Sequence, residues 1–376
     1  MLVKFDYSKI NKYGMEKNNF DRYKDIESIL IYGDKDKIKD PVISVVIPTF
    51  RRASTLKAAI DSVLNQVEHN CRYEVIVLDN EPPADEISET EKLIRTYHND
   101  NLLYYKNAQN IGLFGNWNRA FEVSRGRWVA MLHDDDLLAI DYFIMAQKLI
   151  NKVEHRNKKT AYIQQNAYFI NGNLIDDKKA SIDREKTGNS TSQRFKRRTM
   201  NKVYKYTYMD VLFTGNGCTL GIPSCGTLMN REIFLKEGGY NEDFYPLEDG
   251  YYPTKLMAKY NVYQAIYRAG YYRVDINCSI KKENLIRAVK SYMDYKKEIV
   301  NSGKFVSFFI HFFEKELDAK MIDRLVNLTT SGNCPIDVHE FSDLLKYEPR
   351  KVRGKVLWFC ERFRHKTKKL YGALFS

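Results

Sequence analysis

The sequence has no long apolar run and no paired-cysteine spacing, and both absences narrow its class. Its longest apolar stretch, residues 305–313, contains His311 and is far shorter than the ~20 residues that a membrane-spanning helix needs. The N-terminal residues also lack the apolar stretch of a signal peptide. The six cysteines show no CxxC spacing, which argues against structural zinc and is typical of free thiols in a reducing compartment. We therefore expect a cytoplasmic protein.

Two common nucleotide-binding signatures are missing as well. No GxGxxG or GxxxxGK[ST] follows the first predicted strand, which argues against dinucleotide oxidoreductases and P-loop enzymes. In contrast, 44% of the 376 residues are hydrophobic and 13% are aromatic, so the chain can bury a substantial core.

Strands and helices alternate along the central part of the chain. Strands are predicted at 42–47, 73–78, 102–105, 128–132, 161–170, 226–229 and 262–267, and helices at 54–65, 86–97, 114–123, 141–153 and from Arg231. Such alternation predicts βαβ units and a parallel sheet. Residues 1–40 are expected to be a loosely packed extension with one helix near 21–31. Residues 176–205 are expected to be a mobile basic insertion, and 281–376 a helical C-terminal region.

Three consecutive aspartates, Asp134, Asp135 and Asp136, follow the predicted strand 128–132. Adjacent carboxylates repel one another and resist burial, so their place at the end of a buried strand indicates a bound cation. Carboxylate oxygens suit Mg²⁺ or Mn²⁺. The alternative is a solvated acidic loop in which Asp136 caps the next helix. We interpret the neighbouring His133 as a residue that packs rather than as a ligand.

Polar residues also end the other predicted strands, at residues 48–52, 79–80 and 107–112. In an open parallel sheet, ligands bind at the carboxyl ends of the strands. The first of these loops offers backbone N–H groups at a helix start, together with Arg51, for phosphates. Asp79 can accept a hydrogen bond from a base N–H. The pattern therefore predicts a nucleotide site.

Seven segments resemble, in order and spacing, the family 2 glycosyltransferases with the GT-A fold. They are residues 42–51, 62–66, 74–79, 110–120, 132–136, 238–242 and 247–249. The resemblance covers about residues 41–270 and implies an α/β fold with a mostly parallel sheet flanked by helices. It also implies an inverting transfer of a sugar from a UDP-sugar to a hydroxyl of a saccharide or lipid-linked acceptor, in surface polysaccharide or glycoconjugate synthesis. We expect a catalytic domain at 41–275.

The resemblance implies a role for each matching residue. Asp79 would contact the uracil, Asp134 would touch the ribose, and Asp135 and Asp136 would hold Mn²⁺ or Mg²⁺. The other donor-binding residues would be Pro48, Thr49, Arg51, Asn110 and Gly112. The sequence departs from the family at two places: His133 stands where Asp is frequent, and residues 80–83 (Asn-Glu-Pro-Pro) replace Asp-Gly-Ser.

A second acidic pair, Glu248 and Asp249, lies beyond the first cluster. An attacking acceptor hydroxyl must lose a proton, which requires a carboxylate base. Aspartates that hold a metal cannot serve as that base, so a second acidic cluster is needed. The resemblance implies that Asp249 is the base and that Glu248 orients the acceptor. The alternative is that Asp249 caps a helix beginning at Gly250.

The basic charge is concentrated in the C-terminal tail. Ten Lys or Arg and two Glu between Lys346 and Lys369 give +8 of the formal net charge of +12. Such a basic segment with interspersed aromatic residues suits anionic lipid headgroups. There are two alternatives: the tail could be only a solvated face, or it could bind nucleic acid, which is the less favoured partner. We expect peripheral association with the inner face of the cell membrane.

Two other functions compete with glycosyl transfer. A nucleotidyltransferase that makes nucleotide sugars would have a Gly-rich first loop with a lysine, whereas residues 48–52 read Pro-Thr-Phe-Arg-Arg. A non-catalytic membrane-associated scaffold could keep the fold, but the intact acidic residues at both clusters argue against it.

Overall fold

The computed structural model describes residues 18–156, 159–170, 202–206, 210, 224–257, 259–273, 282–300 and 304–331. Two predicted features lie wholly or largely outside these residues: the basic insertion at 176–205 and the basic tail at 346–376. Within the described residues, Cys71 and Cys225 are free, as the absence of paired spacing predicts, and both are buried.

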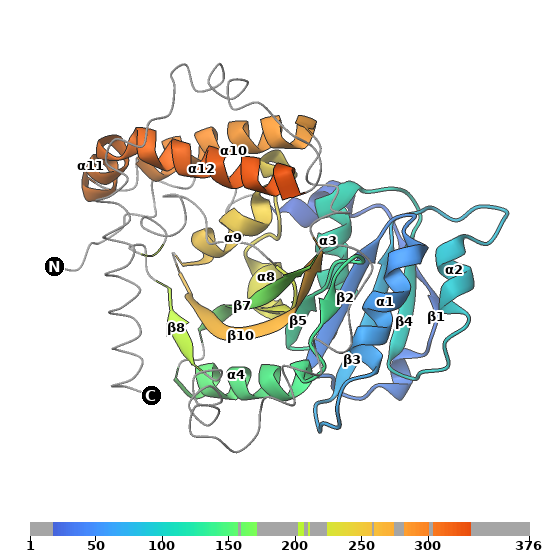
Figure 1. The fold of residues 1–376 in the computed structure, drawn as a ribbon. Coiled ribbons are helices and arrows are strands. Elements are labelled where there is room, and N and C mark those ends of the chain that lie inside the picture. Colours follow the sequence, from blue (N-terminus) through green and yellow to red (C-terminus); the bar gives the residue numbers. More distant parts are fainter. Residues whose placement is uncertain are drawn as a thin grey trace.

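One mixed sheet forms the centre of the molecule (Figure 1). In spatial order its strands are β1 (Ser28–Tyr32), β4 (Leu102–Asn107), β3 (Tyr73–Asp79), β2 (Ile43–Thr49), β5 (Trp128–Met131), β9 (Thr227–Asn230), β7 (Thr160–Ile170), β10 (Asn261–Arg273) and β6 (Leu137–Leu138), and β8 (Val203–Lys205) also pairs with β10. Strands β4, β3, β2 and β5 are parallel, and so are β7 and β10. Strand β9 is antiparallel to both β5 and β7, so the two parallel groups point the same way. The predicted α/β architecture is confirmed.

The central strand β2 is buried along its whole length, as its β-branched sequence predicts. Its alternate side chains enter two different cores. Val45 packs with helices α1 (Ala53–Leu64) and α4 (Tyr142–Arg156) on one face of the sheet. Val46 packs with α3 (Gly112–Val123), α8 (Arg231–Lys236) and α9 (Glu248–Leu256) on the other. The short helix α2 (Glu89–Ile94) is briefer than the predicted 86–97.

Three further helices, α10 (Lys282–Val300), α11 (Lys304–Phe312) and α12 (Glu314–Ser331), lie together beside α9 (Figure 1). A buried cluster joins two of them: Asp318 of α12 accepts hydrogen bonds from Lys296 Nζ at 2.9 Å and Tyr292 Oη at 2.7 Å, both on α10. The predicted helical C-terminal region is confirmed as far as Ser331. Among the described residues, no helix combines the length and apolar character needed to cross a membrane.

The prediction of a helix near residues 21–31 is wrong. A short 3-10 helix, η3 (Asn19–Tyr23), is followed by β1, which pairs antiparallel with β4 and extends the edge of the sheet. The run Ser28-Ile-Leu-Ile-Tyr32 satisfies its backbone groups by pairing, and this tertiary contact outweighs local helical spacing. Asn19 Nδ2 also donates to the carbonyl of Gly238 at 2.9 Å, so residues 18–40 are not loosely packed.

Candidate functional site

The carboxyl ends of β2, β3, β4 and β5 bring the predicted polar residues to one edge of the sheet. Thr49, the last residue of β2, is in register with Asp79 at the end of β3. Strand β5 continues to Leu132, whose N–H donates to Val46 O at 3.0 Å, and then leads into the aspartates. Thr49 Oγ1 donates to Asp134 Oδ2 at 2.8 Å, which joins the first loop directly to the acidic cluster.

The three aspartates are buried, with at most 5% of each residue exposed, which excludes the alternative of a solvated acidic loop. Asp136 does not cap a helix either, because it leads into β6 and its Oδ1 accepts from the N–H of Arg273 at 3.0 Å. Burial raises the pKa of Asp134 to about 6, although the Arg52 guanidinium opposes this rise. Such a cluster carries repulsion that a cation would relieve.

Three side chains could share one cation. Single ligand atoms of His133, Asp135 and Asp136 all lie within 4.8 Å of one another. An imidazole and two carboxylates are donors that a divalent metal accepts, so the residues present fit the predicted cofactor. The set includes His133, which the sequence analysis interpreted as a packing residue.

The ring of His133 has packing contacts on several sides. It stacks on Trp117 with 5.0 Å between ring centroids, and its Nε2 lies 3.1 Å from Ser224 Oγ. Its Nδ1 lies 3.5 Å from Asp136 Oδ2. Burial opposes the charged imidazole, but the neighbouring carboxylates, Asp136 first, raise the pKa of His133 to about 9. These carboxylates therefore favour the charged imidazole, which would balance part of the acidic charge.

The second acidic pair forms the first turn of α9. The helix begins at Glu248, with Leu247 at the N-cap, which excludes the alternative that Asp249 caps a helix starting at Gly250. Carboxylates are stabilised near the positive end of a helix. Asp249 is only partly buried and is one of the groups that raise the pKa of His133. The structure thus brings Asp249 within electrostatic range of the first cluster.

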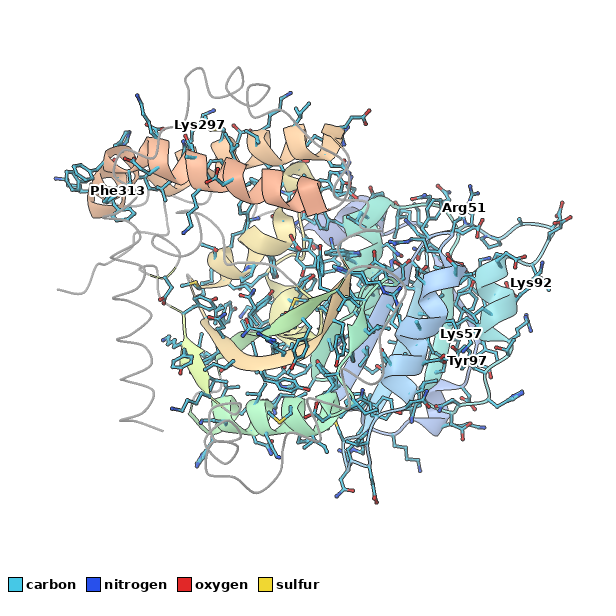
Figure 2. The ribbon with its side chains drawn as sticks, in the orientation of Figure 1. Arg51, Lys57, Lys92, Tyr97, Lys297 and Phe313 are labelled. Atoms are coloured by element: carbon cyan, nitrogen blue, oxygen red, sulfur yellow. The ribbon has the colours of Figure 1, made fainter. Side chains whose placement is uncertain are left out.

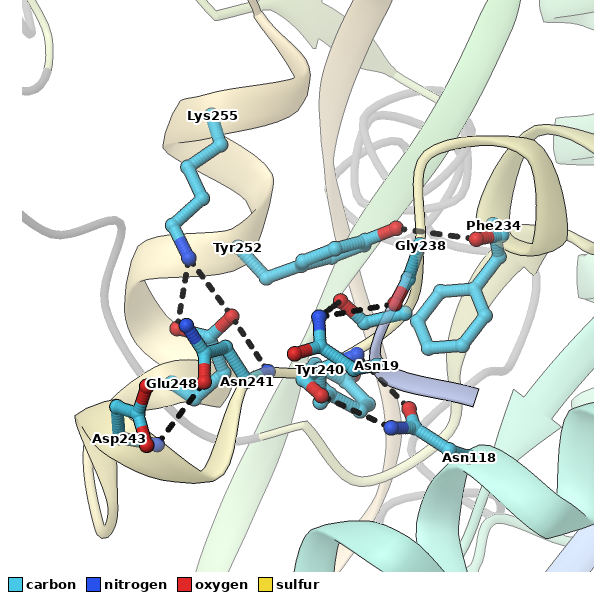
Figure 3. Close-up of polar contacts among 11 residues, drawn as sticks. Asn19, Asn118, Phe234, Gly238, Tyr240, Asn241, Asp243, Glu248, Tyr252 and Lys255 are labelled. Carbon is cyan, nitrogen blue, oxygen red and sulfur yellow. Dashed lines mark hydrogen bonds and ion pairs between the residues drawn. The ribbon is translucent and has the colours of Figure 1, made fainter. Parts of the chain in front are cut away.

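Glu248 has surroundings that the sequence did not predict (Figure 3). It is fully buried, and its two oxygens lie 2.8 and 3.0 Å from Lys255 Nζ, about two helical turns further along α9. It also accepts from the N–H of Asn241 at 3.1 Å. The Glu248 carboxylate is therefore enclosed by protein partners at the start of α9.

Several predicted donor-binding residues already have protein partners. Asp79 is fully buried and accepts from Tyr104 Oη at 2.8 Å and from the N–H of Glu81 at 2.9 Å. Burial raises the pKa of Asp79. Arg51 lies at the outer surface (Figure 2), in the left-handed backbone region with φ of 56°, and its Nε lies 2.8 Å from Glu81 Oε1. Glu81, in the loop at residues 80–83 whose sequence differs from the family pattern, therefore contacts both Asp79 and Arg51.

Asparagines connect this edge of the sheet to the start of α3. Asn80 Oδ1 accepts from Asn107 Nδ2 and from the N–H of Ile111, each at 3.0 Å. Asn80 Nδ2 donates to Asn110 Oδ1 at 2.9 Å and to the carbonyl of Gly112 at 3.0 Å. The structure thus brings together the predicted residues Asn110 and Gly112 and fixes them against β3.

Arg52 and Lys255 are two charged residues of this region for which no role was predicted from the sequence. Arg52 Nη1 lies 3.0 Å from Asp134 Oδ1, and its Nη2 lies 2.8 Å from Asp135 Oδ2. The only sequence signal for Arg52 was a second basic residue at the start of a helix, since its partners are more than 80 residues away. Lys255 carried no signal beyond its place on a helix after Glu248.

Comparison with known proteins decides the family. The sequence model described as Glycosyl transferase family 2 matches residues 44–234, just over half of the chain. The chain belongs to glycosyl transferase family 2. This membership, together with the mixed sheet and its flanking helices, confirms the GT-A-type fold that the resemblance implied.

Several glycosyltransferases and solved structures are similar to the chain. An uncharacterized glycosyltransferase of Methanocaldococcus jannaschii is 29% identical over 152 residues, which is 39% of this chain and 48% of that protein. The GalNAc(5)-diNAcBac-PP-undecaprenol beta-1,3-glucosyltransferase of Campylobacter jejuni is 24% identical over 266 residues, which is 69% of this chain and 75% of that protein. The first relatives are matched over 14% to 63% of their own length. The mannosyltransferase PcManGT from Pyrobaculum calidifontis, solved with GDP-Man and Mn²⁺, is 13% identical with a TM-score of 0.47, over 98% of this chain and 91% of that one.

Proposed function

We propose that the protein is an inverting glycosyltransferase that uses Mn²⁺ or Mg²⁺ and moves a sugar from a UDP-sugar to a hydroxyl of a saccharide or lipid-linked acceptor. The observation that carries the proposal is the pairing of two acidic groups with different surroundings. One is the set of His133 with the buried Asp135 and Asp136, and the other is the partly buried Asp249 within electrostatic range of that set. The catalytic domain would span about residues 41–275, followed by the helical region that begins at α10.

The donor would lie along the carboxyl ends of β2 and β3. Backbone N–H groups at the start of α1 and the guanidinium of Arg51 suit a diphosphate. Thr49 and Pro48 would line the nucleotide, with Asp134 toward the ribose. An ionised carboxylate has about four acceptor sites, so Asp79 can keep its bonds to Tyr104 and Glu81 and still accept from a uracil N–H. Because Asp79 is buried, the Glu81 loop would have to shift to admit the base.

A bound divalent cation would neutralise the charge that develops on the departing diphosphate. His133, Asp135 and Asp136 would hold it. An imidazole ligates a metal only when it is neutral, so His133 would lose its proton on loading. The burial of Asp135 and Asp136 would limit competition from bulk water for the cation.

Asp249 would take the proton from the acceptor hydroxyl. It lies in the first turn of α9 and is not one of the three residues whose ligand atoms could share a cation, so it would be free to act as a base. Glu248 would act as a positioning residue through its buried pair with Lys255, a role different from the acceptor contact that the resemblance implied. Attack from the face opposite the diphosphate would invert the anomeric centre.

The acceptor side of the proposal rests on the relatives. The name of the Campylobacter jejuni relative specifies a diphosphoundecaprenol-linked acceptor, and that protein is matched over 75% of its length. A lipid-linked acceptor would also explain a peripheral enzyme with a basic tail at residues 346–376, on the inner face of the cell membrane.

A panel of nucleotide sugars tests the proposed function. Thermal stabilisation and donor hydrolysis would be measured for UDP-, GDP- and dTDP-sugars, each with MnCl₂ and with EDTA. We expect UDP-sugars to stabilise the protein and to be hydrolysed slowly, both only with metal. Stabilisation by no nucleotide sugar would favour the non-catalytic scaffold. Turnover of a nucleoside triphosphate with a sugar phosphate would favour a nucleotidyltransferase.

A further inference from the structure

Arg52 occupies the position from which a protein cation can neutralise the acidic cluster. It directly precedes α1, and its two terminal nitrogens contact two different aspartates, Asp134 at 3.0 Å and Asp135 at 2.8 Å. The Arg52 side chain is 29% exposed, whereas those of Asp134 and Asp135 are 7% and 5% exposed. The buried carboxylates therefore have their positive partner on the solvent side of the site.

This arrangement puts Arg52 in competition with a metal. Asp135 contributes a ligand atom to the candidate cation set and is at the same time a partner of Arg52. A guanidinium beside Asp135 would repel a divalent cation bound to the same carboxylate, and the repulsion is strong where little water screens it. A metal that binds while Arg52 stays in place must overcome this repulsion and share the Asp135 oxygens.

A diphosphate offers Arg52 a second partner. The planar guanidinium presents five N–H donors in a fork that matches phosphate oxygens as well as carboxylates. Arg52 also stands at the N-terminus of α1, where backbone N–H groups favour an anion. If a nucleoside diphosphate binds there, Arg52 can turn to its phosphates and leave Asp135 to the metal.

We propose that Arg52 is a displaceable internal counterion that couples the binding of metal to the binding of a nucleoside diphosphate. The inference rests on the proposed function and adds a regulatory property to the same site. Before the donor arrives, Arg52 holds Asp134 and Asp135 and keeps metal affinity low. The diphosphate withdraws Arg52, and the vacated carboxylate then accepts the metal. By thermodynamic linkage, each ligand strengthens the other by the same factor.

The test measures Mn²⁺ affinity, by electron paramagnetic resonance of free Mn²⁺, with and without saturating UDP. For the wild-type protein we expect UDP to strengthen Mn²⁺ binding by roughly 5- to 150-fold, the usual range of such coupling. Arg52→Gln should bind Mn²⁺ alone more tightly than wild type, and UDP should strengthen its Mn²⁺ binding by a smaller factor than in the wild type. A tighter site is the opposite of what damage to the fold would cause.

Two more variants sharpen the comparison. Arg52→Lys keeps one charge but cannot bridge two carboxylates, so its Mn²⁺ affinity without UDP should lie between those of wild type and Arg52→Gln. Arg127→Gln removes an exposed arginine that pairs with Glu154 at 3.0 Å, and it should bind Mn²⁺ like the wild type.

Each outcome decides the inference. If UDP and Mn²⁺ both bind the wild-type protein but Arg52→Gln binds Mn²⁺ no more tightly, Arg52 is only a structural ion pair and the inference is wrong, while the proposed function stands. If neither UDP nor Mn²⁺ binds the wild-type protein, the proposed function and the inference both fail.

Discussion

At the scale of single residues, each carboxylate of the site has different surroundings, and these differences could not be predicted from the sequence alone. Asp134 is held by Thr49 and Arg52, and Glu248 is enclosed with Lys255. Asp249 differs from Glu248, its neighbour in the chain, because it remains partly exposed in the first turn of α9. These surroundings are consistent with the proposed roles, proton transfer for Asp249 and positioning for Glu248.

Asp249→Asn should lower sugar transfer by about 10²–10⁴, the usual contribution of a positioned general base. Its shape and much of its hydrogen bonding are kept, so UDP-sugar affinity should stay within a few fold of wild type. Donor affinity by calorimetry and turnover with acceptor are measured separately. Near-normal transfer by Asp249→Asn would mean that another group removes the proton.

Asp135→Ala should remove most of the metal dependence of UDP binding, because Asp135 belongs to the candidate ligand set. Titrations of UDP with MnCl₂ and with EDTA should then give similar affinities for this variant. Asp61→Ala is the matched control, since Asp61 pairs with Lys57 on the exposed side of α1. If Asp135→Ala keeps a large Mn²⁺ effect, the metal is held elsewhere.

At the scale of secondary-structure elements, the start of α9 depends on a buried ion pair. Glu248 and Lys255 are 0% and 5% exposed at their side chains, and Lys255 Nζ also lies 4.5 Å from the centroid of the Phe244 ring. Removing one member of such a pair leaves a buried charge without its partner. Replacing both members by uncharged residues of similar volume leaves no buried charge without a partner.

Lys255→Met should therefore lower the free energy of unfolding by about 3–5 kcal/mol, whereas the double variant Glu248→Gln with Lys255→Met should lose much less. Urea unfolding measures both. Lys57→Met, which breaks the exposed i,i+4 pair with Asp61, should cost only about 0.3–0.5 kcal/mol. Equal losses for the single and double variants would show that Lys255 contributes packing rather than charge.

The same scale shows what could be predicted from the sequence. Strands β2, β3 and β5 were predicted to within a few residues, because each is a continuous apolar run that ends at polar residues. Strand β1 was missed because its short apolar run becomes a strand only by pairing with β4. The aspartates and the pair at 248–249 were identified by local clustering. The Arg52 and Lys255 contacts were not, since an ion pair depends on distances that only the folded chain defines.

At the scale of the whole molecule, the C-terminal helices connect to the loop that precedes the second acidic pair. Ser291 Oγ of α10 donates to the carbonyl of Tyr245 at 3.3 Å, and the Arg287 guanidinium lies 6.0 Å from the Tyr245 ring centroid. Tyr245 follows η5 (Glu242–Phe244) and precedes α9. The helical region is therefore positioned to stabilise the loop where an acceptor would approach Asp249.

Truncation of residues 346–376 should abolish binding to vesicles that contain anionic lipid while donor hydrolysis stays near the wild-type rate. The tail carries +8 of the net charge, and each cation near such a surface contributes about 1 kcal/mol. Flotation with anionic and with neutral vesicles measures the binding, which salt should weaken. A truncated protein that still floats with anionic vesicles would place the membrane contact elsewhere in the chain.

The central claim is that the strand-end acids form a metal-dependent site for a uridine nucleotide. Calorimetric titration of the wild-type protein with UDP, once in MnCl₂ and once in EDTA, tests it most directly. The account predicts tight binding with Mn²⁺ and weak binding with the chelator, since the diphosphate and the buried carboxylates both need the cation between them. Equal affinity in the two titrations, or no binding in either, would contradict it.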